Sequence, residues 1–196
     1  MKNLRNAASL TVAAASVLGL GLGFVGQASA ETPASGSAVI SESNTFLVNA
    51  ASQGIIAVPL PSATASYSGT TGVSATFPVT GGDANLTGFY GTARLGGALL
   101  VVDAKTLRSV TFSQLTYDLY SDQISGVPTN GTTAVPLFVP TGDIRVDKAG
   151  AGAVFSASEV DLDPTGADYL NTKLKTAFFT AGDSVGSLVL NFTPAS

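Results

Sequence analysis

The sequence predicts a mainly β fold, either an antiparallel β-sandwich or an open barrel-like sheet, with one C-terminal amphipathic helix. Short apolar segments alternate with Gly, Asn and Pro turn signals along most of the chain. Only 11% of the residues are charged, and Ser, Thr and Gly are frequent, which suits a folded β protein better than a disordered chain. A single segment near the C-terminus has clear helical periodicity.

The first 30 residues have the three-part pattern of a secretory signal peptide. Lys2 and Arg5 are followed by the apolar run 7–25 and then by Ala28-Ser29-Ala30, so we expect cleavage before Glu31. The alternative is a transmembrane anchor, because about 20 apolar residues can span a bilayer. The well-placed A-x-A end favours cleavage. The mature protein would then have no membrane span and would be extracellular or associated with the cell envelope.

The mature sequence is long enough for one domain. We expect residues 31–37 to form a flexible leader and residues 38–196 to form a single β domain. Without Lys2 and Arg5 the chain keeps 7 of its 9 basic residues against 13 acidic ones, a net charge of −6. This charge gives the protein no electrostatic reason to bind nucleic acid or anionic lipid.

After cleavage the sequence contains no Cys, His or Trp, and its one Met, Met1, is lost. Ser-His-Asp and Cys-His catalysis is therefore excluded within this chain, because both need an imidazole. Zinc sites depend mainly on Cys and His, and Tyr is the one plausible haem ligand that remains. Without disulfides the fold must be held by its core. These absences predict a protein that is not an enzyme and has no metal or cofactor.

Carboxylate chemistry is the remaining catalytic alternative, because two acids at a defined separation in a cleft can hydrolyse a glycoside. Most of the acidic residues lie within two residues of Gly, Pro or Lys, where turns and solvated side chains are expected. The tightest cluster, residues 161–168, lacks the spacing of a calcium loop, and helix capping explains it better. A hydrolase therefore ranks last among the functions considered.

The ordered part is expected to begin at Ala38. Residues 45–58 are predicted to form a strand, one helical turn ending near Gly54, and a second strand, because Gly readily supplies the left-handed conformation at a helix end. Pro59 and Pro61 should then interrupt strand pairing.

Residues 63–101 are expected to be strands joined by tight turns. Residues 63–79 would form two strands around the turn signal SGTTG. The overlapping stretch 77–101, FPVTGGDANLTGFYGTARLGGALLV, carries glycines between apolar residues but lacks the frame of a phosphate-binding loop. An apolar run also follows where a helix would have to start. We therefore predict strand-turn-strand scaffold here rather than a ligand loop.

The segment LRSVTFSQLTYDL contains a change of phase. Val110 and Phe112 occupy even positions, whereas Leu115 and Tyr117 occupy odd ones. Because successive side chains of a strand point to opposite faces, a regular strand could bury only one of these pairs. A β-bulge near residues 113–114 would turn both pairs toward the core.

The C-terminal third should contain the helix. A turn at residues 129–131 (TNG) leads to strands on either side of Gly142. The helix is predicted over Pro164–Ala177 with Asp163 as its cap, and its apolar face should lie against a sheet. That face consists of Ala167, Leu170, Leu174 and Ala177 or Phe178. Residues 184–192 should form the final strand.

The order of these motifs resembles the HtaA-type domain of secreted bacterial proteins. The resemblance rests on FPVTGG at 77–82, GTARLGGAL at 91–99, SVTFSQLTYDL at 109–119, AD-YLN at 167–171 and F-x-x-G at 179–182. It implies a mostly β domain that is found singly or repeated in exported and surface proteins, some of which capture haem.

In the haem-capturing members the resemblance implies a tyrosine ligand in the N-terminal segment and a supporting histidine. This chain departs at both places, because residues 38–54 contain no Tyr and Leu95 stands where the histidine would be. Tyr90 and Arg94 are the alternative haem site, since residues four apart in a strand share a face and Arg94 could support a phenolate. Ordinary alternation, with Tyr90 half buried and Arg94 solvated, is the simpler interpretation.

The sequence therefore predicts a secreted, non-enzymatic β domain with a structural, adhesive or binding role. Its expected partners are a cell-envelope polymer or other surface proteins. The alternative is a module that binds haem or another apolar ligand.

Overall fold

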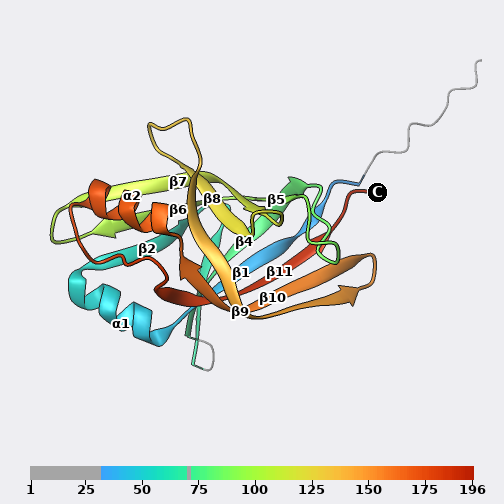
Figure 1. Cartoon of the computed structure of the whole chain (residues 1–196), viewed down its shortest axis with the longest axis horizontal. Helices are drawn as coiled ribbons and strands as arrows, with labels where there is room; N and C mark the ends of the chain where they lie inside the picture. Colours follow the sequence, from blue (N-terminus) through green and yellow to red (C-terminus); the bar gives the residue numbers. More distant parts are fainter. Residues whose placement is uncertain (1–31, 70–71) are drawn as a thin grey trace, which may run out of the picture. The chain divides into compact units, whose positions relative to one another are not determined.

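The computed structural model describes residues 32–69 and 72–196. Residues 31–196 form one compact unit (Figure 1). The predicted signal peptide, residues 1–30, lies outside the described residues, as does part of the predicted SGTTG turn. Within the described ranges, no helix combines the length and apolar character needed to cross a membrane.

Strands dominate the described part of the chain, with a helix near each end. The strands are β1 (Ser35–Glu42), β2 (Ile55–Leu60), β3 (Thr64–Ser68), β4 (Gly72–Gly82), β5 (Thr92–Leu95), β6 (Ala98–Asp103), β7 (Arg108–Asp118), β8 (Gln123–Pro128), β9 (Val135–Ala149), β10 (Gly152–Leu162) and β11 (Ser184–Thr193). The helices are α1 (Asn44–Gln53) and α2 (Pro164–Leu174).

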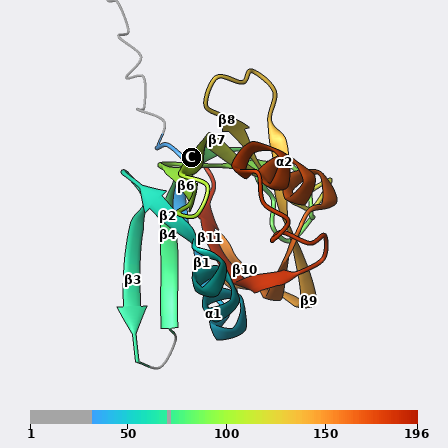
Figure 2. The same cartoon turned by 90° about the vertical axis from the view of Figure 1, so that its left-hand side faces the viewer.

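Eight antiparallel strands close into a barrel in the order β7-β5-β4-β1-β11-β10-β9-β8, and β8 pairs back onto β7. The mainly β, barrel-like prediction is therefore confirmed. Closure leaves no free edge within the barrel, whereas β2 and β3 remain at edges of the extended sheet. Strands β6 and β2 extend the sheet outward from β7, and β3 pairs with β4. Figure 2 shows the barrel nearly end-on, with the β3–β4 hairpin projecting beyond it.

The short strand β5 divides one wall of the barrel. It pairs with residues 79–82 of β4 on one side and with residues 116–118 of β7 on the other. Beyond β5, β4 continues with β3 as its partner, whereas β7 continues with β6. The two long strands thus take separate partners at the end of the unit that carries both helices (Figure 1).

The predicted bulge in β7 is confirmed. The register between β7 and β8 shifts between Ser113 and Thr116, and Gln114 adopts a φ of 50°. The extra residue corrects the phase of the strand. Apolar residues on both sides of the bulge are buried: Val110, Phe112, Leu115 and Tyr117.

Helix α2 begins at Pro164, as predicted. The Asp163 carboxylate accepts a hydrogen bond from the backbone N–H of Thr165 at 2.7 Å and so caps the first turn. The helix ends three residues earlier than predicted, at Leu174, because Lys175 takes the left-handed conformation with φ 58°. Its predicted apolar face is buried against β7 and β9: Ala167, Leu170 and Leu174. The final strand β11 also agrees with the prediction to within a residue.

The prediction for residues 45–53 was wrong, because they form α1 rather than a strand and a single turn. The Ser43 hydroxyl caps this helix by accepting a hydrogen bond from the Phe46 N–H at 3.0 Å. Gly54, with a φ of 79°, ends the helix as the sequence indicated. The helix forms because it places Phe46 and Leu47, together with Ala50, on the interior of the barrel end.

The predicted leader is also ordered in large part. β1 begins at Ser35 rather than at Ala38 and pairs with both β11 and β4. Thr32 exchanges backbone hydrogen bonds with Ser196, at 2.7 and 3.1 Å. The two ends of the compact unit therefore pair with each other.

Two further strand predictions need correction. Pro59 does not interrupt β2, where it pairs with Leu99 of β6. It is tolerated because β2 lies at the end of the sheet order. Similarly, β9 continues through Gly142 as one strand, and an irregularity in its pairing with β10 absorbs this glycine.

Candidate functional site

Tyr90 and Arg94, the residues of the alternative haem site, lie in different surroundings. Tyr90 lies in the loop between β4 and β5, is 55% exposed, and accepts a hydrogen bond from the Asn85 side-chain amide at 2.9 Å. Gly91, with a φ of 81°, separates it from β5 and breaks the alternation that would align it with Arg94. The Arg94 guanidinium lies over Gly81, where an added Cβ would come within 2.5 Å of it.

The glycine-rich stretch 77–101 consists of strands and a turn, as predicted. It forms the end of β4, a loop tied by the pairing of Asn85 with Tyr90, and then β5 and most of β6. Leu95, which stands at the position compared with a histidine, is 4% exposed and faces the barrel interior. Leu95 lines an apolar cavity in the core.

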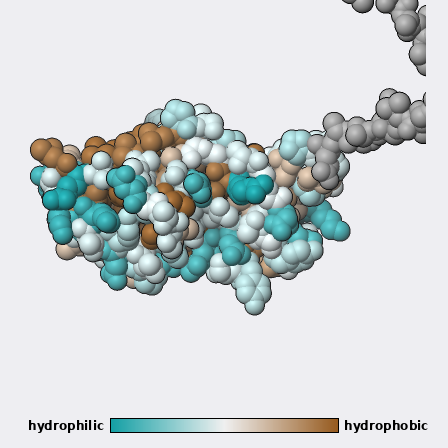
Figure 3. All heavy atoms as spheres, turned by 90° about the horizontal axis from the view of Figure 1, so that it is seen from above, coloured by the Kyte–Doolittle hydropathy of each residue, from teal (hydrophilic) through white to brown (hydrophobic). Residues whose placement is uncertain are grey.

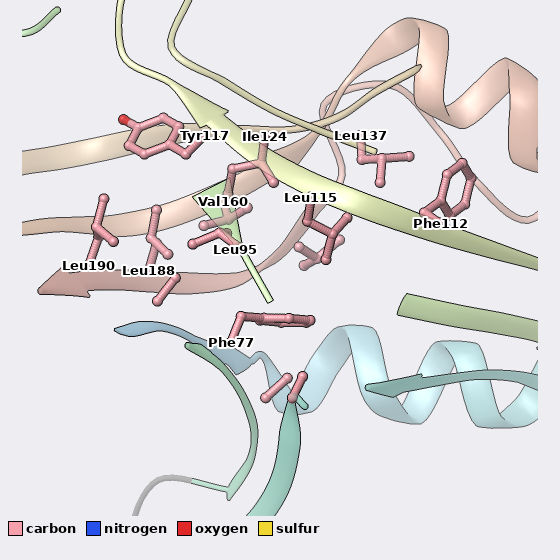
Figure 4. Close-up of a cluster of buried hydrophobic side chains, with 14 of the residues drawn as sticks. Phe77, Leu95, Phe112, Leu115, Tyr117, Ile124, Leu137, Val160, Leu188 and Leu190 are labelled. Atoms are coloured by element: carbon pink, nitrogen blue, oxygen red, sulfur yellow. The ribbon is translucent and has the colours of Figure 1, made fainter. Parts of the chain in front are cut away.

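An apolar cavity of about 270 Å³ lies inside the end of the barrel that carries the helices. Side chains from nearly every strand and from both helices line it, so its shape depends on the whole fold. In Figure 4 the ring of Phe77 lies on one side, with Leu95 and Leu115 opposite. The lining side chains drawn and labelled there are Phe77, Leu95, Phe112, Leu115, Ile124 and Leu137.

Helix α1 covers this cavity, and the neighbouring aromatic residues complete the cover. Phe46 and Leu47 of α1 line the cavity, and the Phe46 ring lies 5.8 Å from that of Phe178. Phe178 in turn packs edge-on against Phe179, at 5.0 Å between ring centroids. Asn171 of α2 fixes Phe179 with two hydrogen bonds to its backbone, at 2.7 and 3.1 Å. Asn171 of α2 therefore fixes the aromatic residues of this cover through the backbone of Phe179.

The cavity opens beside α1 and β2. Ala51 of α1 and Ile56 and Ala57 of β2 line the cavity and are also exposed to solvent. Ile56 is 51% exposed, and the next outward residue on β2, Val58, is also exposed. Figure 3 shows apolar residues gathered at the same end of the unit. Ile56 and Val58 therefore present exposed apolar side chains beside the opening.

Glu42 is the one charged residue in the cavity lining; all the other lining side chains are apolar. It ends β1 on the same side as Ala38 and Ile40, so strand alternation turns it inward. Burial raises the pKa of the Glu42 carboxyl above its ordinary value. Glu42 was not predicted as a site residue, although the alternation of Ala38, Ile40 and Glu42 along one strand indicates an inward-facing acid.

Several other acids have structural partners at turns and helix ends. Asp103 accepts hydrogen bonds from the N–H groups of Lys105 and Thr106, and Asp118 accepts one from Tyr120. Asp163 caps α2, as described above. In residues 32–69 and 72–196 we find no cluster of three or more His, Cys, Asp or Glu side chains suited to a metal ion.

The cavity does not fit haem. Haem iron is held by His, Cys, Met or Tyr, and the lining, all of it within the described residues, offers none of these donors. Tyr117 is buried, but it does not line the cavity, and its hydroxyl donates a hydrogen bond to the Asp122 carboxylate. Burial and this carboxylate both raise the pKa of Tyr117, which disfavours a phenolate.

A second depression, lined by both polar and apolar residues, lies between the β7–β8 region and α2. We call it the basic groove, because Arg108 and Lys173 line it beside Tyr169 and polar residues such as Thr111 and Asn130. The Lys173 ammonium lies 5.3 Å from the centre of the Tyr169 ring. The groove thus joins two positive charges to hydrogen-bonding side chains on a protein of net negative charge.

Comparison with protein-family models finds no match, and neither does comparison with curated proteins. Among solved structures, the C-terminal domain of HtaA from Corynebacterium glutamicum is similar, with a TM-score of 0.54 and 11% sequence identity. The alignment covers 85% of this chain and 100% of that chain. At this identity the likeness shows a shared fold, and at the level of fold it confirms the resemblance seen in the sequence.

Proposed function

We propose that this chain is a secreted, non-enzymatic binding domain that takes a small apolar molecule into the cavity beneath α1. The observation that carries the proposal is the cavity itself, which is enclosed by apolar side chains and opens beside α1. The predicted signal peptide and the shared fold with a domain of HtaA support a place outside the cytoplasm or in the cell envelope.

Energetics favour a ligand over a permanently empty space. Protein cores pack to the density of organic crystals, and voids of this size are uncommon. A bound apolar molecule would restore the missing contacts, because a dry apolar cavity of about 150 Å³ already binds benzene.

A neutral dye that fluoresces in apolar surroundings, N-phenyl-1-naphthylamine, tests this function. Titrated into residues 31–196, it should give saturable fluorescence enhancement and raise the unfolding temperature, because it binds the native state. Ala75 lines the cavity from β4, and Ala75→Phe should abolish dye binding by filling the space. The same variant should unfold at a higher temperature than wild type.

The matched control is Ala65→Leu, because Ala65 is paired with Ala75 on the adjacent strand but is exposed. It should bind dye as wild type does. Ala50→Leu enlarges a lining residue on α1 and gives an independent test if Ala75→Phe does not fold. Dye binding that survives both fillings would show that the cavity is not the site.

The basic groove favours a second function, adhesion to a cell-envelope polymer that carries acidic sugars. Arg108 and Lys173 supply charge, and the hydrogen-bonding side chains beside them suit sugar hydroxyls. Arg108→Ser combined with Lys173→Gln should weaken sedimentation with polygalacturonate about tenfold. Arg145→Ser, on exposed β9, is the control and should have little effect. Equal sedimentation of all three proteins would refute this role.

A further inference from the structure

Glu42 gives the cavity a chemical preference, an inference that rests on the proposed binding function. Its side chain comes from the end of β1, directly before Ser43, the cap of α1. The lining around it is otherwise apolar. The apolar part of a ligand that fills the cavity would therefore contact apolar side chains, and the Glu42 carboxylate would be the one charged group it contacts.

This carboxylate has no partner within the described part of the protein. Across residues 32–69 and 72–196, no donor forms a hydrogen bond or an ion pair with the Glu42 side chain. The buried acids Asp103 and Asp163 have N–H donors, whereas one buried carboxylate oxygen of Asp161 has none. The Glu42 carboxylate is partly buried and keeps some contact with solvent, so its incomplete hydration disfavours the charged form. A donor supplied by the ligand would offset that loss of hydration.

We infer that the cavity selects amphiphiles whose head group is an amine or a hydroxyl and discriminates against those with a carboxylate head. An amine or a hydroxyl can donate a hydrogen bond to Glu42, and an ammonium adds charge attraction. A carboxylate head would place two like charges together in a poorly solvated site. The volume of about 270 Å³ suits a molecule larger than benzene, such as a single medium-length chain or a small ring system.

Three molecules with the same chain and different heads test the inference: 1-octanol, octylamine and sodium octanoate. Each is titrated at pH 7.5 against residues 31–196 loaded with N-phenyl-1-naphthylamine. Octanol and octylamine should displace the dye at concentrations at least tenfold lower than octanoate. With Glu42→Gln, the concentrations of the three molecules that displace the dye should lie within about threefold of one another. This variant removes the charge of the side chain but keeps its shape.

Glu159→Gln is the matched control, because Glu159 lies on β10, is exposed and does not line the cavity. It should keep the wild-type order. If octanoate displaces the dye from wild type as readily as octanol, the head-group inference is wrong although binding stands. If the dye does not bind wild type at all, the proposed function fails first. The wild-type order tests the inference even where Glu42→Gln is poorly folded, and Glu42→Leu gives a second variant without the charge.

Discussion

At the scale of single residues, Glu42 should make stability depend on pH. Burial raises the pKa of this carboxyl in the folded state above its ordinary value, which it keeps in the unfolded chain. Between these two values the unfolded chain releases the proton first, so the free energy of unfolding falls as the pH rises. The stabilisation associated with the neutral carboxyl is complete below the unfolded pKa and is lost above the folded pKa.

The expected result is that Glu42→Gln gains stability relative to wild type as the pH rises from about 4 to 7. The amide that replaces the carboxyl stays neutral throughout this range, whereas the wild-type carboxyl ionises. Urea unfolding at a series of pH values measures the difference between the two proteins. Glu159→Gln is the control for removal of one exposed acid. Parallel profiles for wild type and Glu42→Gln would contradict the expectation.

Tyr90 is the residue that tests the haem alternative. Its phenol is exposed and bonded to Asn85, while the Arg94 guanidinium lies over Gly81. We therefore expect haemin, titrated into residues 31–196, to give no tyrosinate-type absorption change. Tyr90→Phe should have the same spectrum as wild type. An absorption band that forms with wild type and disappears in Tyr90→Phe would instead establish a haem site at this loop.

At the scale of elements, local signals predicted those parts of the fold that depend on nearby residues. The bulge in β7 followed from the opposite phases of Phe112 and Leu115, and the start of α2 followed from Asp163 and Pro164. Helix α1 was missed because the apolar run Phe46-Leu47-Val48 is equally compatible with a strand. Ser43 and Gly54 favour a helix locally, but burial of its apolar face depends on the barrel end, which is built from strands distant in sequence.

At the bulge in β7, the backbone of Gln114 has a positive φ of 50°. A β-branched side chain is strained in that conformation, so Gln114→Val should lower the free energy of unfolding by about 1–2 kcal/mol. Gln114→Gly should be neutral or slightly stabilising for the same reason. Ser113→Val, at the preceding exposed position, is the control and should change stability much less. Equal losses at both positions, measured by urea unfolding, would argue against the strain.

At the scale of the whole molecule, the sequence predicted the barrel-like class but not the cavity. Alternation shows which side chains face inward, whereas the unfilled volume depends on how side chains from many elements meet. Leu95 and Phe77 could be identified as core residues, but no local pattern says that a space of about 270 Å³ remains between such residues. The alternation along β1 could have predicted that Glu42 faces inward. That orientation has a functional meaning only because Glu42 lines the cavity.

We expect the signal peptide to be removed before Glu31, and the pairing at the ends of the compact unit is compatible with this cleavage. Thr32 pairs with Ser196 through backbone hydrogen bonds, so cleavage at this point would leave every observed pairing of the unit intact. When the full chain is expressed in a secreting bacterial host, the exported protein should have the intact mass of residues 31–196. Its N-terminal sequence should begin at Glu31. Replacing Lys2 and Arg5 with Asp should reduce export strongly, because the positive n-region is lost. Lys148→Asp, which alters a basic residue of β9, is the control and should be exported normally. An uncut chain found in the membrane fraction would instead support the anchor alternative.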